Sequence, residues 1–469
     1  MAVPSTPCAL SSVVPVLAVL AVLYSWLLAT VNQIVPDPYM DEIFHIPQAQ
    51  HYCQDRFHEW DPKLTTFPGL YLVSTLCTRA LSWMNGGAFY CSVSMLRSLN
   101  VVFALGNVVL CVLLRRHVSP HDHNGLLHAV RVAAFPPLFF FSFLFYTDSG
   151  ATFFVLLTAW LAERVDLAQN PSGGGSFFVL SATSGAVAVL FRQTNIVWVG
   201  FVAGTVVVRY AELAHSTFIY GFPKIVMNFI RVVVSNLPSI LLIVWPFVVI
   251  VAGFVVFLLM NGGIVVGDKS SHEVTFHGAQ VLYFLIVAAS GFGLSLVAPT
   301  YVRAFAASVR RNGSSVRGFL FISFLIAATV GIIFCFSPVH KFMLADNRHY
   351  TFYIWRKFFL KHDMAKFVPA PLYVYLGWRC RKELERRRSP LWTLVFVLAT
   401  CLVLVPSPLV EPRYFCVPFL IFHLNTGNQA ASHLWTAIVA YMMVNALTLY
   451  VFLYCPYDWV DGSTARFMW

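Results

Sequence analysis

The chain has 469 residues, of which 58% are hydrophobic and 11% are charged, and its mean hydropathy is +0.72. A soluble globular protein carries about 25% charged residues, so a chain this apolar is expected to use lipid as its solvent. The formal charge of +11 does not indicate a nucleic-acid partner, because the basic residues cluster in short loops between apolar runs, as cytoplasmic loops of membrane proteins do.

Apolar runs of roughly 17–25 residues recur along the chain, which is long enough to cross a bilayer as helices and unlike the alternating ~10-residue strands of a barrel. We predict an all-α polytopic membrane protein with about 12–14 transmembrane helices. Its polar segments are too short for a core of their own, so residues 1–469 are expected to form a single domain. The candidate spans are 9–31, 67–84, 95–115, 128–146, 149–165, 177–191, 194–209, 236–260, 279–299, 318–337, 364–378, 390–407, 413–424 and 434–454. The first of them is interpreted as a retained helix or signal anchor.

The longest polar run in the first half is PDPYMDEIFHIPQAQHYCQDRFHEWDPKLTTFPG, residues 36–69. Four of its polar residues have the i, i+4, i+7 and i+11 spacing of one helix face, namely Asp41, His45, Gln48 and Tyr52. Pro47 would bend such a helix. The pattern predicts a short, bent, amphipathic helix on the membrane surface with a carboxylate at its start, and the alternative is a solvated acidic loop.

The basic run at 378–389 predicts a cytoplasmic loop. The next span, 390–407, then runs outward and places 411–414 on the opposite side of the membrane, and counting spans backwards places 338–350 on that side too. The 36–69 loop joins them there if the first span runs outward. Counting forwards disagrees by one crossing with the basic pair at 115–116, so one short segment is expected not to cross.

That opposite side therefore collects acids and cations, which are costly at membrane depth and by default mark a function or a partner. Arg and Lys can clamp a phosphate, and a carboxylate can take a proton from an attacking hydroxyl. This points to chemistry on a lipid-linked anion. The alternative is salt bridging between helices, for example Asp346 with Arg348 or Glu411 with Arg413. Asp148 and Arg192 are weaker candidates, because the crossing count leaves their side open.

Trp60, Asp61 and Tyr52 can stack on and hydrogen-bond a sugar, or they can anchor the loop at the interface. The ten cysteines are scattered without a CxxC pair, which argues against a disulfide framework or a zinc site. Cys53 has no evident partner. Neither the histidines between 117 and 128 nor the carboxylates have convincing metal-ligand spacing, so no metal or other cofactor is expected.

Several longer motifs resemble one family: MDEIFHIPQAQHYC, WDPKLTTFPGLY, FRQTNIVWV, LADNRHYTFYIWRK, LVEPRYF and the terminal RFMW. They look like the endoplasmic-reticulum α-1,2-glucosyltransferases that use dolichyl-phosphate glucose. Those enzymes add the last glucose to the lipid-linked oligosaccharide before its transfer to asparagine. The resemblance runs from near the start of the chain to its last residues.

This resemblance implies a multi-span glycosyltransferase of the GT-C architecture in the endoplasmic-reticulum membrane. The active site would lie in the first lumenal loop, beside a hydrophobic groove for the dolichyl chain. The expected partners are dolichyl-phosphate glucose, the lipid-linked oligosaccharide acceptor and membrane lipid, with no obligate protein partner. A β-linked donor and an α-linked product imply inversion in a single displacement, which needs one general base and a stabilised leaving phosphate.

By resemblance to the Asp-Glu pair of other GT-C enzymes, Asp41 is expected to be the base. Glu42 is the runner-up or an orienting group, since adjacent helix residues point about 100° apart. The candidates for the donor phosphate are Arg348, His349, Lys341 and Arg413. The candidates for acceptor or sugar binding are Gln48, Trp60, Asp61 and His45.

Two other classes of function remain open at this point. A lipid or sugar transporter, including a flippase, should show internal repeats or matched broken helices, and the sequence contains no convincing repeat. A non-catalytic regulator of a membrane channel would not need acids and cations gathered on one side.

Overall fold

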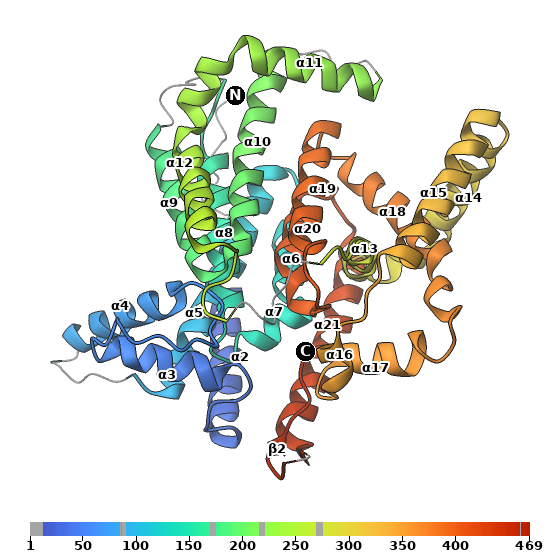
Figure 1. The fold of residues 1–469 in the computed structure, drawn as a ribbon. Coiled ribbons are helices and arrows are strands. Elements are labelled where there is room, and N and C mark those ends of the chain that lie inside the picture. The colour runs from blue at the N-terminus through green and yellow to red at the C-terminus, as the bar shows by residue number, and fades with distance from the viewer. Residues whose placement is uncertain are drawn as a thin grey trace.

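The computed structural model describes residues 13–84, 86, 91–168, 175–214, 221–268, 275–459 and 461–469, with the side chains of 341 and 342 left out. These residues are mostly helical, which confirms the predicted all-α class (Figure 1). The helices are α2 (Val13–Ile34), α3 (Glu42–Cys53), α4 (Gly69–Met84), α5 (Val93–Val118), α6 (Gly125–Ala133), α7 (Pro136–Phe141), α8 (Thr147–Glu163), α9 (Gly175–Phe191), η1 (Gln193–Asn195), α10 (Ile196–Ala214), α11 (Phe222–Ser235), α12 (Leu237–Asn261), α13 (Ala279–Ser290), η2 (Gly293–Val297), α14 (Pro299–Gly313), α15 (Val316–Cys335), α16 (Lys341–Ala345), α17 (Tyr350–Ile354), η3 (Trp355–Phe359), η4 (Ala365–Phe367), α18 (Ala370–Leu384), α19 (Pro390–Leu404), η5 (Pro412–Phe415), α20 (Cys416–Leu424) and α21 (Ala431–Tyr454). Strands β1 (Tyr457–Asp458) and β2 (Thr464–Ala465) pair antiparallel near the C-terminus.

Six helices in the described residues are long and apolar enough to cross a membrane, or seven if α13 and the 293–313 segment, bent by 112°, count as one span. The six lie at Val13–Ile34, Val93–Val118, Gln193–Ala214, Leu237–Asn261, Val316–Cys335 and Ala431–Tyr454. This is fewer than the 12–14 spans expected from the apolar runs. The difference arises because many of those runs form helices shorter than 18 residues or helices that are interrupted.

The bundle has two chemically different ends, which α5 connects. Near its start, Arg97 contacts Glu42, and near its end Arg115 donates to the carbonyl of Thr426 at 2.6 Å. A rise of 1.5 Å per residue separates these two arginines by about 27 Å. Arg387 also reaches the second end, where it donates to Asn428 at 2.8 Å. We call this second end the basic end. The end that holds Glu42 is called the cavity end, because a cavity lined by the adjacent Asp41 opens there.

The predicted span 128–146 crosses between the two ends as a broken helix. The ring of His128 in α6 contacts the carbonyl of His423 at 2.7 Å near the basic end. The chain is then interrupted before α7, where Pro136 and Pro137 follow each other. Tyr146, the last residue of the predicted span, accepts a hydrogen bond from the Asp41 N–H at the cavity end. The interruption is tolerated because this stretch is buried in protein rather than exposed to lipid.

The predicted span 67–84 is corrected by the structure, because its helix α4 folds back along α3. The two helices lie side by side in Figure 1. Cys53 at the end of α3 and Cys91 beyond α4 form a disulfide with a Cα–Cα distance of 6.5 Å. At 16 residues, α4 is not among the described helices that are long and apolar enough to cross a membrane. Without a crossing at 67–84, the span count agrees with the basic residues at 115–116.

The same disulfide gives Cys53 the partner that was not evident from the sequence. The two cysteines are 38 residues apart, and no local pattern links them. Their pairing brings together residues from the two sides of α4, which is a tertiary event. Gln50 adds a hydrogen bond from its side chain to the carbonyl of Cys91 at 3.1 Å.

Glu42 anchors the start of α3, the helix predicted around Pro47 and confirmed as residues Glu42–Cys53. Its carboxylate is completely buried. It accepts from Arg97 Nε at 2.9 Å and from Arg97 Nη2 at 2.6 Å. It also accepts from the backbone N–H groups of Tyr39 at 3.1 Å and Phe145 at 2.6 Å. These four bonds tie the first loop to α5 and to the turn before α8.

Removing the charge of Glu42 should destabilise the protein strongly. Glu42→Gln leaves the Arg97 guanidinium buried without a counterion, and breaking a buried pair costs about 3–5 kcal/mol. The midpoint of thermal unfolding in detergent should fall well below that of wild type. Glu59→Gln is the control, because the ion pair of Glu59 with Arg56 is substantially solvent-exposed and should contribute little. Equal midpoints for the two variants would contradict this role for Glu42.

Loss of the disulfide should also lower the unfolding midpoint. Disulfides typically contribute about 2–4 kcal/mol, so Cys91→Ser should unfold at a lower temperature than wild type. Reductant should lower the midpoint of wild type but not that of the variant. Cys77→Ser, at a free cysteine, should still respond to reductant, and an identical response of all three proteins would rule out the bond.

Candidate active site

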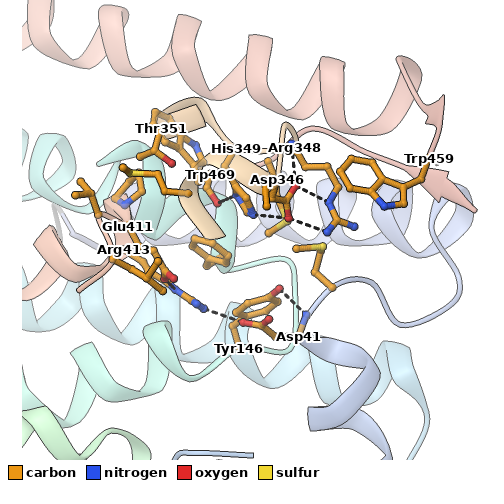
Figure 2. Close-up of a pocket in the computed structure, with 18 residues that line it drawn as sticks. Asp41, Tyr146, Asp346, Arg348, His349, Thr351, Glu411, Arg413, Trp459 and Trp469 are labelled. Atoms are coloured by element: carbon orange, nitrogen blue, oxygen red, sulfur yellow. Dashed lines mark hydrogen bonds and ion pairs between the residues drawn. The ribbon is translucent and has the colours of Figure 1, made fainter. Parts of the chain in front are cut away.

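A cavity of about 370 Å³ opens at the cavity end (Figure 2). Its walls come from five stretches that are far apart in the sequence. They contribute Met40, Asp41, Phe141, Tyr146, Met343, Ala345, Asp346, Arg348, His349, Thr351, Leu409, Val410, Glu411, Pro412, Arg413, Trp459, Met468 and Trp469. The three polar segments that the sequence placed on one side of the membrane thus meet at a single site.

Asp41 presents its carboxylate to this cavity. It follows Met40, whose φ of 55° is unusual for a residue other than glycine and turns the chain into α3. The Asp41 N–H donates to the Tyr146 hydroxyl at 3.1 Å. The side chain is 42% exposed, whereas that of the adjacent Glu42 is fully buried. The two acids therefore occupy different environments.

Arg413 is the direct partner of Asp41. Its Nη1 donates to Asp41 Oδ2 at 3.1 Å, across 372 positions of sequence, and Figure 2 shows the guanidinium pointing toward that carboxylate. Its Nε donates to Glu411. Burial acts to raise the pKa of Asp41, but the positive charges around it, Arg413 first among them, and the hydrogen bond from Arg413 together outweigh burial and hold the pKa below its ordinary value. Asp41 is therefore ionised at neutral pH.

Arg348 and His349 lie on another wall of the same cavity. Arg348 donates to Asp346 through Nε at 2.8 Å and Nη2 at 2.7 Å, so the salt bridge considered from the sequence is present. Its guanidinium carbon also lies 4.5 Å from the Trp459 ring centroid, a cation–π contact. His349 Nδ1 is 2.9 Å from the main-chain oxygen of Trp469.

Lys341, the remaining predicted phosphate ligand, begins α16. Its side chain lies outside the part of the chain that the structure describes.

The four predicted acceptor residues are not among the described residues that line the cavity. Gln48 donates to the carbonyl of Glu59 at 2.7 Å and accepts from the N–H of Asp61 at 2.9 Å. Trp60 packs edge-on against Tyr71, at 5.9 Å between ring centroids. These contacts brace the first loop and place its side chains against α4.

His45 belongs to the same bracing contacts. Its Nδ1 lies 2.6 Å from the Tyr71 hydroxyl, and the ring is buried. Burial lowers its pKa to about 4, so the imidazole is neutral at physiological pH and adds no positive charge near Asp41.

Sequence reasoning missed the contribution of the C-terminal segment. Met468 forms a parallel bridge with His349 and donates its N–H to the carbonyl of Arg348 at 2.8 Å. This brings Trp459 and Trp469 into the cavity wall. The RFMW motif was the available signal, but nothing in it specifies which segment it contacts.

A second cavity of about 260 Å³ adjoins the first, and Arg413 lines both. It contains Asp148 and Arg192, which form an ion pair at 2.5 Å, so the structure brings both residues to the cavity end. Apolar residues of α10, α19, α20 and the 264–265 loop make up much of the rest of its lining, including Ile196, Val197, Ile264, Val265, Leu402, Val403 and Val417.

Known proteins can now be compared with this chain. A curated protein of Rattus norvegicus, named Dol-P-Glc:Glc(2)Man(9)GlcNAc(2)-PP-Dol alpha-1,2-glucosyltransferase, is 36% identical over 94% of this chain and 95% of its own length. Proteins with the same name from Arabidopsis thaliana and Drosophila melanogaster are each 34% identical, over 97% and 92% of this chain and 99% and 94% of their own lengths.

A solved structure of the Archaeoglobus fulgidus oligosaccharyltransferase in the apo form aligns with 92% of this chain and 51% of its own. Its TM-score of 0.40 and 12% identity are too low to support an argument. A family model described as the DIE2/ALG10 family matches residues 35–424. Together with the identity to the curated relatives over nearly the whole length, this match shows that the chain belongs to the DIE2/ALG10 family.

Proposed function

We propose that this protein transfers glucose from dolichyl-phosphate glucose to the diglucosylated lipid-linked oligosaccharide, forming an α-1,2 linkage. The observation that carries the proposal is the meeting of Asp41 with Arg413 in one cavity, which pairs an ionised carboxylate with a cation suited to phosphate. The names of the relatives support the donor and the acceptor. Those names give no support to a transporter or a channel regulator.

The proposed reaction is a single inverting displacement. The acceptor hydroxyl oxygen bonds to C1 of glucose while the bond from C1 to the phosphate oxygen breaks. The hydroxyl proton passes to Asp41, and dolichyl phosphate leaves with the bonding electron pair. Arg413 stabilises the charge that develops on the leaving phosphate. A β-linked donor then gives an α-linked product.

Asp41 is assigned as the base in preference to Glu42 because of their hydrogen bonds. Each Glu42 oxygen already accepts one bond from Arg97 and one from a backbone N–H. The carboxylate is sealed from the cavity and has no room for a substrate hydroxyl. Glu42 acts as a positioning residue that fixes the neighbouring Asp41 at the cavity.

The proposed location of the site is the lumenal face of the endoplasmic-reticulum membrane. The arginines of the basic end match the positive-inside pattern of cytoplasmic loops. The cavity lies at the other end of the bundle, and the disulfide at the end of α3, the helix that follows Asp41, suits an oxidising compartment.

The direct test is a transfer assay with purified protein. Dolichyl-phosphate glucose and a diglucosylated lipid-linked acceptor should give a triglucosylated product whose new linkage is α-1,2. Dolichyl-phosphate mannose serves as the control donor and should give little product. Absence of glucose transfer by folded protein supplied with both substrates would overturn the proposal.

Asp41→Asn should reduce glucose transfer about 10²–10⁴-fold, the usual contribution of a general base, while the variant still binds donor. The measurement is kcat in the transfer assay, with the unfolding midpoint checked in parallel. Asp55→Asn is the matched control, since Asp55 lies in the same loop but is 71% exposed and paired with Arg79. Wild-type turnover in Asp41→Asn would remove Asp41 from the chemistry.

A further inference from the structure

We propose that Arg413 is a latch on the base: it holds Asp41 until a prenyl-linked phosphate enters the second cavity and draws the guanidinium away. This inference rests on the proposed function, because it assigns the second cavity to the donor. It adds an order of events, in which the donor must bind before Asp41 is free to accept a proton.

The position of Arg413 is the first support. Its side chain lines both cavities and is 21% exposed. On one side, Nη1 is bonded to the carboxylate of Asp41 at 3.1 Å. On the other side lies Arg192, whose guanidinium carbon is 5.3 Å from the ring centroid of Tyr414, the residue that follows Arg413. A small shift of one long side chain would exchange Asp41 for a ligand between Arg413 and Arg192.

The balance of charge decides which cavity suits a phosphate. Among the described lining residues, the first cavity has three carboxylates, those of Asp41, Asp346 and Glu411, against two arginines, Arg348 and Arg413. In that cavity, Arg348 already forms two hydrogen bonds with Asp346. An anion entering there would face an excess of negative charge.

The second cavity has the opposite balance. Its described lining contains Arg192 and Arg413 against the single carboxylate of Asp148. Arg192 is paired with Asp148 at 2.5 Å through Nη1, so a phosphate there would be attracted by its remaining donors and by Arg413, since guanidinium groups bind phosphate oxygens through paired donors. The first-cavity residues Arg348 and His349, expected from the sequence to bind donor phosphate, then lie on the side of the acceptor.

The rest of the second cavity matches the prenyl chain and the sugar, the two groups bonded to such a phosphate. Its aliphatic lining suits a prenyl chain, which can exchange contact with lipid tails for contact with aliphatic side chains of similar polarity. Asp148 is only 3% exposed, and its Oδ2 has no hydrogen-bond partner among the described residues. Buried polar atoms are normally paired, and a hydroxyl of the sugar carried by the phosphate would complete this one.

The latch has a chemical consequence for Asp41. A carboxylate that is paired with an arginine is a weak base, because the cation stabilises its ionised form. When the phosphate takes the guanidinium, Asp41 loses this stabilisation and becomes a stronger base. The donor would thus activate the base that attacks it, and the acceptor hydroxyl would occupy the place that Arg413 vacates.

Binding of dolichyl phosphate, measured on the purified full chain in nanodiscs, tests the latch. If Asp41 and the phosphate compete for Arg413, removing the Asp41 charge should tighten binding. Asp41→Asn should lower Kd roughly 5-fold or more, which corresponds to a coupling free energy between Asp41 and the bound phosphate of more than about 1 kcal/mol. In an Arg413→Ala background, the same substitution should leave Kd unchanged.

Asp346→Asn is the matched control, because it removes a carboxylate from the same cavity but releases Arg348 rather than Arg413. It should change Kd less than Asp41→Asn does. Tightening by Asp346→Asn that equals or exceeds that of Asp41→Asn would place the phosphate on Arg348 or indicate a general charge effect, and either overturns the latch.

Two further results would also overturn it: an unchanged Kd in Asp41→Asn, or tightening that persists without Arg413. Should Arg413→Ala fail to fold, Arg413→Gln takes its place in the comparison. The wild-type transfer assay separates the two proposals. Normal glucose transfer together with an unchanged Kd in Asp41→Asn rejects only the latch, whereas absence of transfer rejects the function on which it rests.

Discussion

The buried pair of Glu42 and Arg97 is the interaction on which the site depends. In a chain with 11% charged residues, a carboxylate sealed inside the protein must be paired and hydrogen-bonded to be tolerated. Glu42 meets that condition with four bonds, and they fix the first loop to α5 and to the turn at Phe145. Since Asp41 is its neighbour, the anchor of Glu42 sets where the Asp41 carboxylate can lie.

The reaction centre is then completed by parts of the chain that are remote in sequence. Arg413 arrives from the η5 turn between α19 and α20, and the C-terminal segment closes another wall through the contact of Met468 with Arg348. The loops of the basic end lie at the opposite end of α5, about 27 Å along its axis, where Arg115 is bonded to the carbonyl of Thr426. One end of the bundle thus carries the proposed chemistry, while the other has the charge pattern of a cytoplasmic face.

Much of this organisation was predictable from the sequence, because apolar runs and polar segments have local signatures. The helix around Pro47 and the gathering of Asp41, Arg348 and Arg413 at one end are both found in the structure. The family followed from the motifs, and the comparisons confirm it.

What could not be predicted depends on tertiary packing. The disulfide joins Cys53 to a residue 38 positions away, and the 16-residue helix α4 packs against α3. The bonds of Gln48 to Glu59 and of His45 to Tyr71 are also tertiary contacts. Spacing along a helix does not reveal which polar groups a neighbouring segment will occupy.

On the proposed function, Asp41 and Arg413 face the two reacting groups of one displacement. A cryo-electron microscopy structure of Asp41→Asn, bound to dolichyl-phosphate glucose and the diglucosylated acceptor, tests it most directly. We expect the acceptor hydroxyl within hydrogen-bonding distance of residue 41 and the donor phosphate on the Arg413 guanidinium. A phosphate held elsewhere, or an acceptor hydroxyl that does not approach residue 41, would contradict it.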